Sequence, residues 1–63
     1  MDRIQYTGLN YMQVREFTGG RVMAPYECMG FSMLSLMMED GTTVTVNEGD
    51  WIVRDENGKF SIE

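Results

Sequence analysis

Acidic side chains are the most numerous groups in this sequence that could do chemistry. Ten Asp and Glu residues stand against five Lys and Arg residues, and the sequence has no histidine. Without histidine, neither a Ser-His nor a Cys-His nucleophile pair can form, and the single cysteine, Cys28, follows Glu27 and has no basic neighbour to stabilise a thiolate. The common zinc ligand sets cannot be assembled for the same reason. We therefore expect a protein that is not an enzyme and that uses no cofactor or metal.

The carboxylates gather beside turn signals. They are Glu39-Asp40 before Gly41, Asp55-Glu56 before Asn57-Gly58, and Glu48 and Asp50 around Gly49. Solvated carboxylates are typical of turns, and the same groups could bind a basic surface by imitating phosphates. A formal net charge of -5 works against direct binding to nucleic acids or to anionic membranes. The pattern favours a basic protein partner, with Glu39, Asp40, Asp55 and Glu56 as contact residues.

A second possibility is a site for a small nucleotide. Such a site needs an aromatic ring for the base and guanidinium groups for the phosphates. The residues that could form it are Tyr6, Arg15, Arg21, Tyr26 and Arg54. Because carboxylates outnumber arginines, the acidic contact ranks ahead of this site, but both hypotheses stay open.

The first third of the chain predicts a strand followed by a short helix. Residues 3–8 alternate apolar and polar side chains and end at a glycine, as a short strand does. Asn10 with Gln13 three positions later has the pattern of a helix start, and Gly19-Gly20 predicts its end. A helix this short is stable only when it packs on a sheet.

The remaining sequence predicts two hairpins. Asp40-Gly41 and Asn57-Gly58 are typical of two-residue hairpin turns, which would pair Glu39 with Thr42 and Glu56 with Lys59. Residues 21–27, which include Pro25, predict a loop or an irregular edge strand.

This pairing gives the first hairpin two apolar faces. One carries Phe31, Met33, Met37, Val44 and Val46, and the other carries Leu34, Leu36 and Met38. Because one helix can cover only one face, we expect it on the first, and we expect Leu34, Leu36 and Met38 at a subunit or partner interface. In the second hairpin we expect Trp51 to pack the sheet against the helix.

The predicted fold is a single α+β domain over residues 1–63. It has a small antiparallel β-sheet of about four to five strands in two hairpins, with one short α-helix packed on one face. A core this small needs support, and a lone cysteine cannot form an internal disulfide, so we expect a homo-oligomer. The sequence has no apolar run of membrane-spanning length and no signal-peptide core at its start, which predicts a cytoplasmic protein with Cys28 reduced.

The order of these motifs resembles a family of short hypothetical proteins of tailed phages. The matching segments are Tyr6-Thr7-Gly8, residues 16–20, residues 39–46, Gly49-Asp50-Trp51-Ile52, and the Asn-Gly-Lys-Phe turn at residues 57–60. The chain departs from the family in lacking a longer basic first strand and a Lys-Pro-containing tail. The resemblance implies a phage origin and a counter-defence role in the host bacterial cytoplasm, as in anti-CRISPR proteins, and it supplies no catalytic residues.

Three functions follow as hypotheses from the residues and the resemblance together. The first is inhibition of a host immune protein by occlusion of a basic surface. The second is a sponge for a nucleotide immune signal, and the third is a structural accessory module of the phage.

Overall fold

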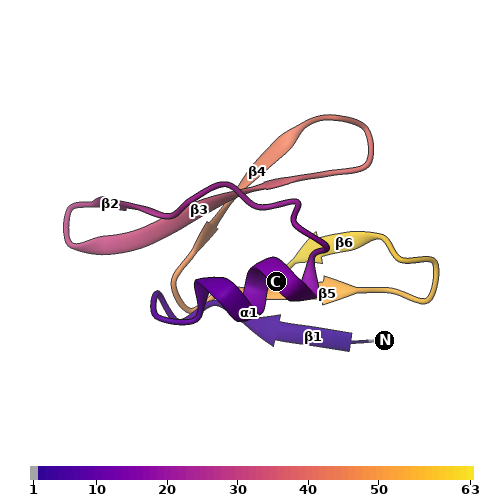
Figure 1. Cartoon of the computed structure of the whole chain (residues 1–63), viewed down its shortest axis with the longest axis horizontal. Coiled ribbons are helices and arrows are strands. Elements are labelled where there is room, and N and C mark those ends of the chain that lie inside the picture. Colours follow the sequence, from indigo (N-terminus) through magenta and orange to yellow (C-terminus); the bar gives the residue numbers. More distant parts are fainter. Residues whose placement is uncertain (1) are drawn as a thin grey trace.

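The computed structural model describes residues 2–63 as two three-stranded antiparallel sheets and one short helix (Figure 1). The elements are β1 (Asp2–Gln5), α1 (Tyr11–Phe17), β2 (Tyr26–Cys28), β3 (Phe31–Met37), β4 (Thr43–Asn47), β5 (Trp51–Arg54) and β6 (Phe60–Ile62). We call β1-β5-β6 the terminal sheet and β2-β3-β4 the central sheet. The expected antiparallel pairing and the short helix are confirmed, but the single sheet of four to five strands is replaced by six strands in two sheets.

The helix lies where its flanking residues predict. At its end, the N–H groups of Gly19 and Gly20 donate to carbonyl oxygens of the last turn, and Gly19 has a φ of +69°. This hydrogen-bond pattern is a Schellman motif, which requires a left-handed residue. At its start, the Asn10 side chain caps no helical N–H group; its Oδ1 accepts from the Thr7 N–H at 2.9 Å and its amide donates to the Gln5 carbonyl at 2.8 Å. Asn10 therefore ties the helix to the end of β1.

Both predicted hairpins form, but each is shifted by one residue because its turn has three residues instead of two. Met37 pairs with Thr43, so residues between them form a longer loop than expected. Within the two turns only the glycines have positive φ, +87° at Gly41 and +81° at Gly58. A two-residue type I′ turn needs positive φ at both central residues, whereas the three-residue turn needs it only at the last.

The shift decides which side of the central sheet is core. It places Val44 and Val46 of β4 opposite Leu36 and Leu34 of β3, so the branched aliphatic side chains share one face. Leu34, Leu36 and Val46 are completely buried, and Met38 is partly buried against them. The expectation that Leu34, Leu36 and Met38 form an open interface face is therefore wrong: they belong to the core of the chain.

In the second hairpin, too, the face that enters the core is the opposite of the one expected. Ile52 pairs with Ile62 and is completely buried, while Trp51 is half-buried on the opposite side of the strand. The Arg3 guanidinium lies 4.4 Å from the centre of the Trp51 ring. The expectation that Trp51 packs the sheet against the helix is wrong, because the shifted register gives that place to Ile52.

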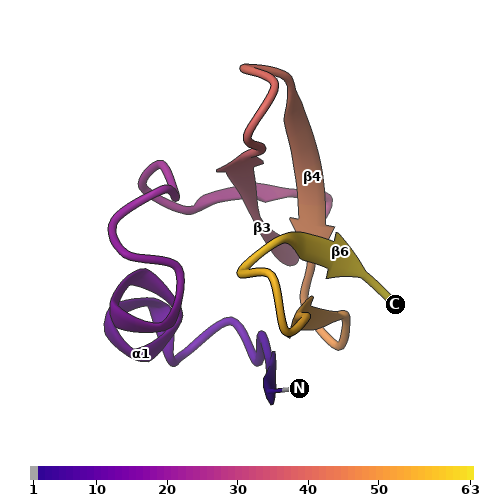
Figure 2. The ribbon, with the colours of Figure 1, turned by 90° about the vertical axis from the view of Figure 1, so that its right-hand side faces the viewer.

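The core lies between the two sheets and the buried side of α1 (Figure 2). Its members are Tyr6, Val14, Val22, Leu34, Leu36, Val46, Ile52 and Phe60. Figure 1 shows the central sheet crossing over α1 and the terminal sheet, which leaves the far side of the central sheet facing away from both.

One hairpin was not predicted. Cys28 of β2 pairs with Phe31 of β3 across a two-residue turn, in which Met29 and Gly30 have φ of +54° and +84°. Before it, Val22 forms an isolated bridge with Leu36, so residues 21–27 continue along the same edge of β3 with a break. The expected irregular edge strand is confirmed for this segment.

Candidate functional site

Two acidic turns project from the same end of the molecule (Figure 1). We define them as residues 39–41, between β3 and β4, and residues 55–58, between β5 and β6. Their three-residue loops are Glu39-Asp40-Gly41 and Glu56-Asn57-Gly58, so Glu39 and Glu56 occupy equivalent first positions. Similar sequences thus fold into similar loops and place two glutamates at one end of a molecule about 35 Å long.

The aspartates of these turns are part of the turn structure. Asp40 Oδ1 accepts from the Thr42 hydroxyl at 2.6 Å and from the Thr42 N–H at 3.0 Å, and these hydrogen bonds hold the pKa of Asp40 below its ordinary value of 3.8. Asp55 Oδ1 accepts from the backbone N–H groups of Asn57 and Lys59 at 2.8 and 2.9 Å. Such bonds rigidify each loop.

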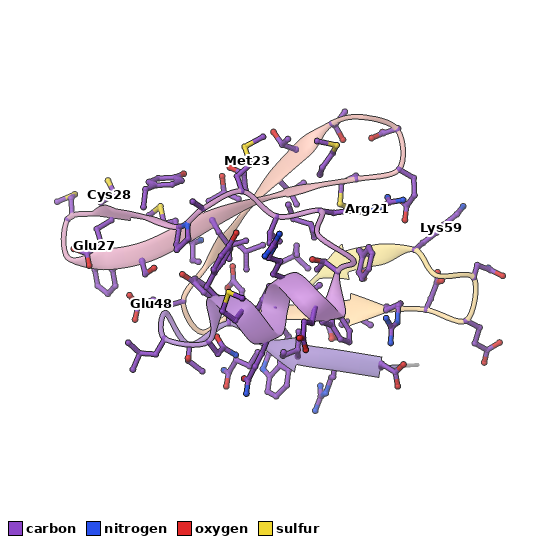
Figure 3. The ribbon with its side chains drawn as sticks, in the orientation of Figure 1. Arg21, Met23, Glu27, Cys28, Glu48 and Lys59 are labelled. Carbon is purple, nitrogen blue, oxygen red and sulfur yellow. The ribbon has the colours of Figure 1, made fainter. Side chains whose placement is uncertain are left out.

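Glu39 and Glu56 are the free carboxylates of this end. Both are exposed, and neither forms a hydrogen bond or an ion pair with any side chain or N–H group in residues 2–63. Three basic residues lie near this end: Lys59, directly after the second turn, Arg54, directly before it and paired with Asp2, and Arg21, which lies beside Met37 on the edge of β3 (Figure 3). With Asp40 and Asp55 included, the two turns carry four carboxylates.

The five residues of the nucleotide hypothesis are not brought together. Tyr6 is completely buried, and Arg54 is engaged in an ion pair. Arg21 and Tyr26 lie beside β3 residues four positions apart, which is about 13 Å along a strand. Arg15 borders a shallow depression at the end of α1 that none of the other four residues lines.

Arg54 is a structural residue. Its guanidinium pairs with the Asp2 carboxylate at 2.8 Å, lies 4.5 Å from the centre of the Phe17 ring and donates to the Phe17 carbonyl at 3.2 Å. The hydrogen bond from Arg54, with its charge, lowers the pKa of Asp2. This is the only ion pair within residues 2–63, so the remaining carboxylates of that range have no basic partner there.

A surface depression of about 270 Å³ lies at the opposite end from the acidic turns. Its lining residues are Thr7, Gly8, Leu9, Glu27, Gly30, Ser32 and Glu48. Glu48 Oε1 accepts from the Ser32 N–H at 2.6 Å, so this carboxylate fastens the β4–β5 connection to the start of β3. The location of Glu48 here separates it from the acidic turns with which the sequence grouped it (Figure 3).

A second surface is the side of the central sheet that faces away from α1, and Phe31, Met33 and Met37 lie on it instead of under the helix as expected. We call it the outer face; it comprises Met23, Tyr26, Cys28, Phe31, Met33 and Met37. Figure 3 shows Met23 and Cys28 on this side, and Cys28 is exposed. The methionines of this hairpin indicated an apolar surface, but the predicted register placed Met33 and Met37 on the side covered by the helix.

Other classes of site are not seen in the part of the chain that the structure describes. Residues 2–63 contain no cluster of His, Cys, Asp and Glu side chains able to hold a metal ion. They also contain no helix whose length and apolar character would let it cross a membrane.

Comparison with protein-family models, with curated proteins and with solved structures gave no match to this chain. The resemblance to short tailed-phage proteins therefore stays a prediction made from the sequence.

Proposed function

We propose that this chain is a non-enzymatic binding protein that occludes a basic surface on a host protein with its two acidic turns. The observation that carries the proposal is the equivalent placement of Glu39 and Glu56 at one end, both exposed and without partners within residues 2–63. A basic groove that normally binds nucleic-acid phosphates would meet carboxylates at two separate points.

The physical effect of these carboxylates is mainly on the rate of association. Exposed charges steer a partner of opposite sign toward the correct orientation and raise the association rate, while each contributes little to stability. The hydrogen bonds of Asp40 and Asp55 hold the loops in one conformation. Less conformational entropy is then lost when the partner binds.

The biological role follows from the same chemistry and from the resemblance to phage proteins. A nucleic-acid-binding enzyme of a bacterial immune system has the basic groove that such carboxylates fit. We accordingly propose a phage-encoded counter-defence inhibitor that acts in the host cytoplasm.

The experiment is affinity capture from a bacterial lysate with two matched double variants. Glu39→Lys with Glu56→Lys reverses the free carboxylates of the acidic turns. Glu16→Lys with Glu63→Lys changes the net charge equally at two other exposed positions. We expect wild type and the second variant to retain the same basic protein, and the first variant to lose it. Equal retention by both variants would contradict the proposal.

A further inference from the structure

The outer face of the central sheet is apolar and lacks cover. Phe31 is 60% exposed, Met23 52%, Tyr26 48% and Met37 44%, whereas Leu34 and Leu36 on the inner side of the same strand are completely buried. Scattered apolar residues are normal on a surface, but a contiguous patch of this kind marks an interaction site.

The strand pairing shows that the β2–β3 part of the patch is contiguous, while Ser35 lies between Met33 and Met37 on the same side of β3. Tyr26 lies opposite Met33 and Cys28 lies opposite Phe31, so these four side chains are neighbours on one side of the sheet. Glu27 lies opposite Ser32 and therefore points to the other side. The β4 residues on the outer side are Thr43, Thr45 and Asn47, which are also uncharged.

The charges on and around the outer face favour a second copy of this chain as its binding partner. The chain carries a formal charge of -5, yet none of the residues that define the outer face is a carboxylate, and Arg21 lies at its border beside Met37. A basic partner would find no opposite charge on this face. Two copies of the chain that met elsewhere would bring their carboxylates together, while two that met here would not.

We infer that the outer face binds the outer face of a second copy of this chain, in a two-fold symmetric dimer. Symmetric contact between identical patches is the usual geometry of such dimers. The flexible side chains of Met23, Met33 and Met37 can adapt to each other, and burial of Phe31 and Tyr26 supplies apolar area that the thin core of one chain lacks. The inference is independent of the acidic turns, because neither turn belongs to the outer face.

Sedimentation velocity over a range of micromolar concentrations tests the dimer. We expect wild type to sediment as a dimer and Phe31→Glu to raise the dissociation constant at least about 30-fold, the loss typical of an interface hot spot. The matched control is Met12→Glu, which places the same charge at an exposed methionine on α1, 61% exposed and outside the outer face. It should dimerise as wild type does.

Cys28 supplies a second measurement. Its thiol is exposed in the single chain and lies beside Phe31, so the dimer should cover it. Reaction of the thiol with Ellman's reagent should slow as the wild-type concentration rises and should stay constant for Phe31→Glu. A monomeric wild type, equal effects of Phe31→Glu and Met12→Glu, or a concentration-independent thiol rate in wild type would each overturn the inference.

Discussion

Tyr6 shows how a single side chain connects the two sheets. It follows β1 in the terminal sheet, is completely buried, and its hydroxyl forms a 2.6 Å hydrogen bond with the hydroxyl of Ser32 in the central sheet. A buried tyrosine needs such a partner, because an unpaired polar group in the core is costly. The nucleotide hypothesis counted Tyr6 as a stacking residue, which its burial excludes in this fold.

Replacement of Tyr6 by Phe should therefore destabilise the protein. Loss of the hydrogen bond, which leaves the Ser32 hydroxyl with one partner fewer, should lower the free energy of unfolding by about 1 kcal/mol. In thermal denaturation this corresponds to roughly 4–8 °C in a domain of this size. Tyr26→Phe is the control, measured at a low protein concentration where the proposed dimer is dissociated; since Tyr26 is 48% exposed in the single chain, it should leave the midpoint unchanged. Equal shifts in both variants would contradict the role of the Tyr6 hydroxyl.

Asp40 should make one turn sensitive to acid. Hydrogen bonds from Thr42 lower the pKa of Asp40 below 3.8, so the ionised form is favoured in the folded state. The resulting stability is complete above pH 3.8 and is lost as the pH falls through the lower folded pKa. We expect Asp40→Asn to be less stable than wild type at neutral pH in urea denaturation, and the difference to shrink in acid. A stability difference between the two proteins that grows in acid would contradict a lowered pKa of Asp40 in the folded state.

At the residue scale, the sequence indicated which segments supply core residues better than it indicated which side of a strand faces the core. Trp51 and Ile52 are adjacent, so their side chains point to opposite sides of β5. Which of them enters the core depends on the partner strands: Ile52 lies between Ile4 and Ile62, whereas Trp51 lies between Gln5 and Glu63. The size of Trp51 favoured the wrong choice.

At the scale of the elements, the sequence predicted the positions of the turns but not their lengths. Asp-Gly and Asn-Gly predicted where the chain reverses, and both reversals occur there. They did not predict loop length, since a glycine with positive φ serves two-residue and three-residue turns alike. The β2–β3 turn was not predicted, because Met29, which has a φ of +54°, is not a residue type that is typical of left-handed turns.

The Gly58 turn permits a test of this backbone assignment. No atom lies within 4 Å of the position a Cβ would take at Gly58, so a substitution there meets no steric contact, but its φ is +81°. Gly58→Ala should cost about 1 kcal/mol in denaturant unfolding, while Gly58→Asn should cost less, because Asn tolerates the left-handed conformation. Equal stability of Gly58→Ala and wild type would show that the loop is not of this type.

At the scale of the whole molecule, the two faces of β3 have exchanged their expected roles. The sequence correctly indicated that one helix cannot cover both apolar faces of this hairpin. It could not indicate the existence of two sheets, because β1 pairs with β5 across most of the chain length and no local pattern encodes that contact. The second sheet, together with α1, encloses the Leu34 and Leu36 side.

Two adjacent residues of β3 test this exchange directly. Leu36 is completely buried, and Met37 is 44% exposed on the other side. Leu36→Ala should cost about 2–5 kcal/mol, the range for a buried leucine, whereas Met37→Ala should change stability by less than about 0.5 kcal/mol. The free energies of unfolding should be measured at a low protein concentration, where the proposed dimer is dissociated. A larger loss for Met37→Ala would restore the face assignment made from the sequence.

The most direct test of the proposed function is the association rate with the captured basic protein as a function of salt. The Debye length falls from about 30 Å at 0.01 M to about 8 Å at 0.15 M ionic strength, so steering by exposed carboxylates should weaken over this range. We predict that the wild-type rate falls steeply with added salt, and that Glu39→Lys with Glu56→Lys associates more slowly and loses this dependence. Equal rates and equal salt dependence for wild type and the double variant would contradict the role of the acidic turns.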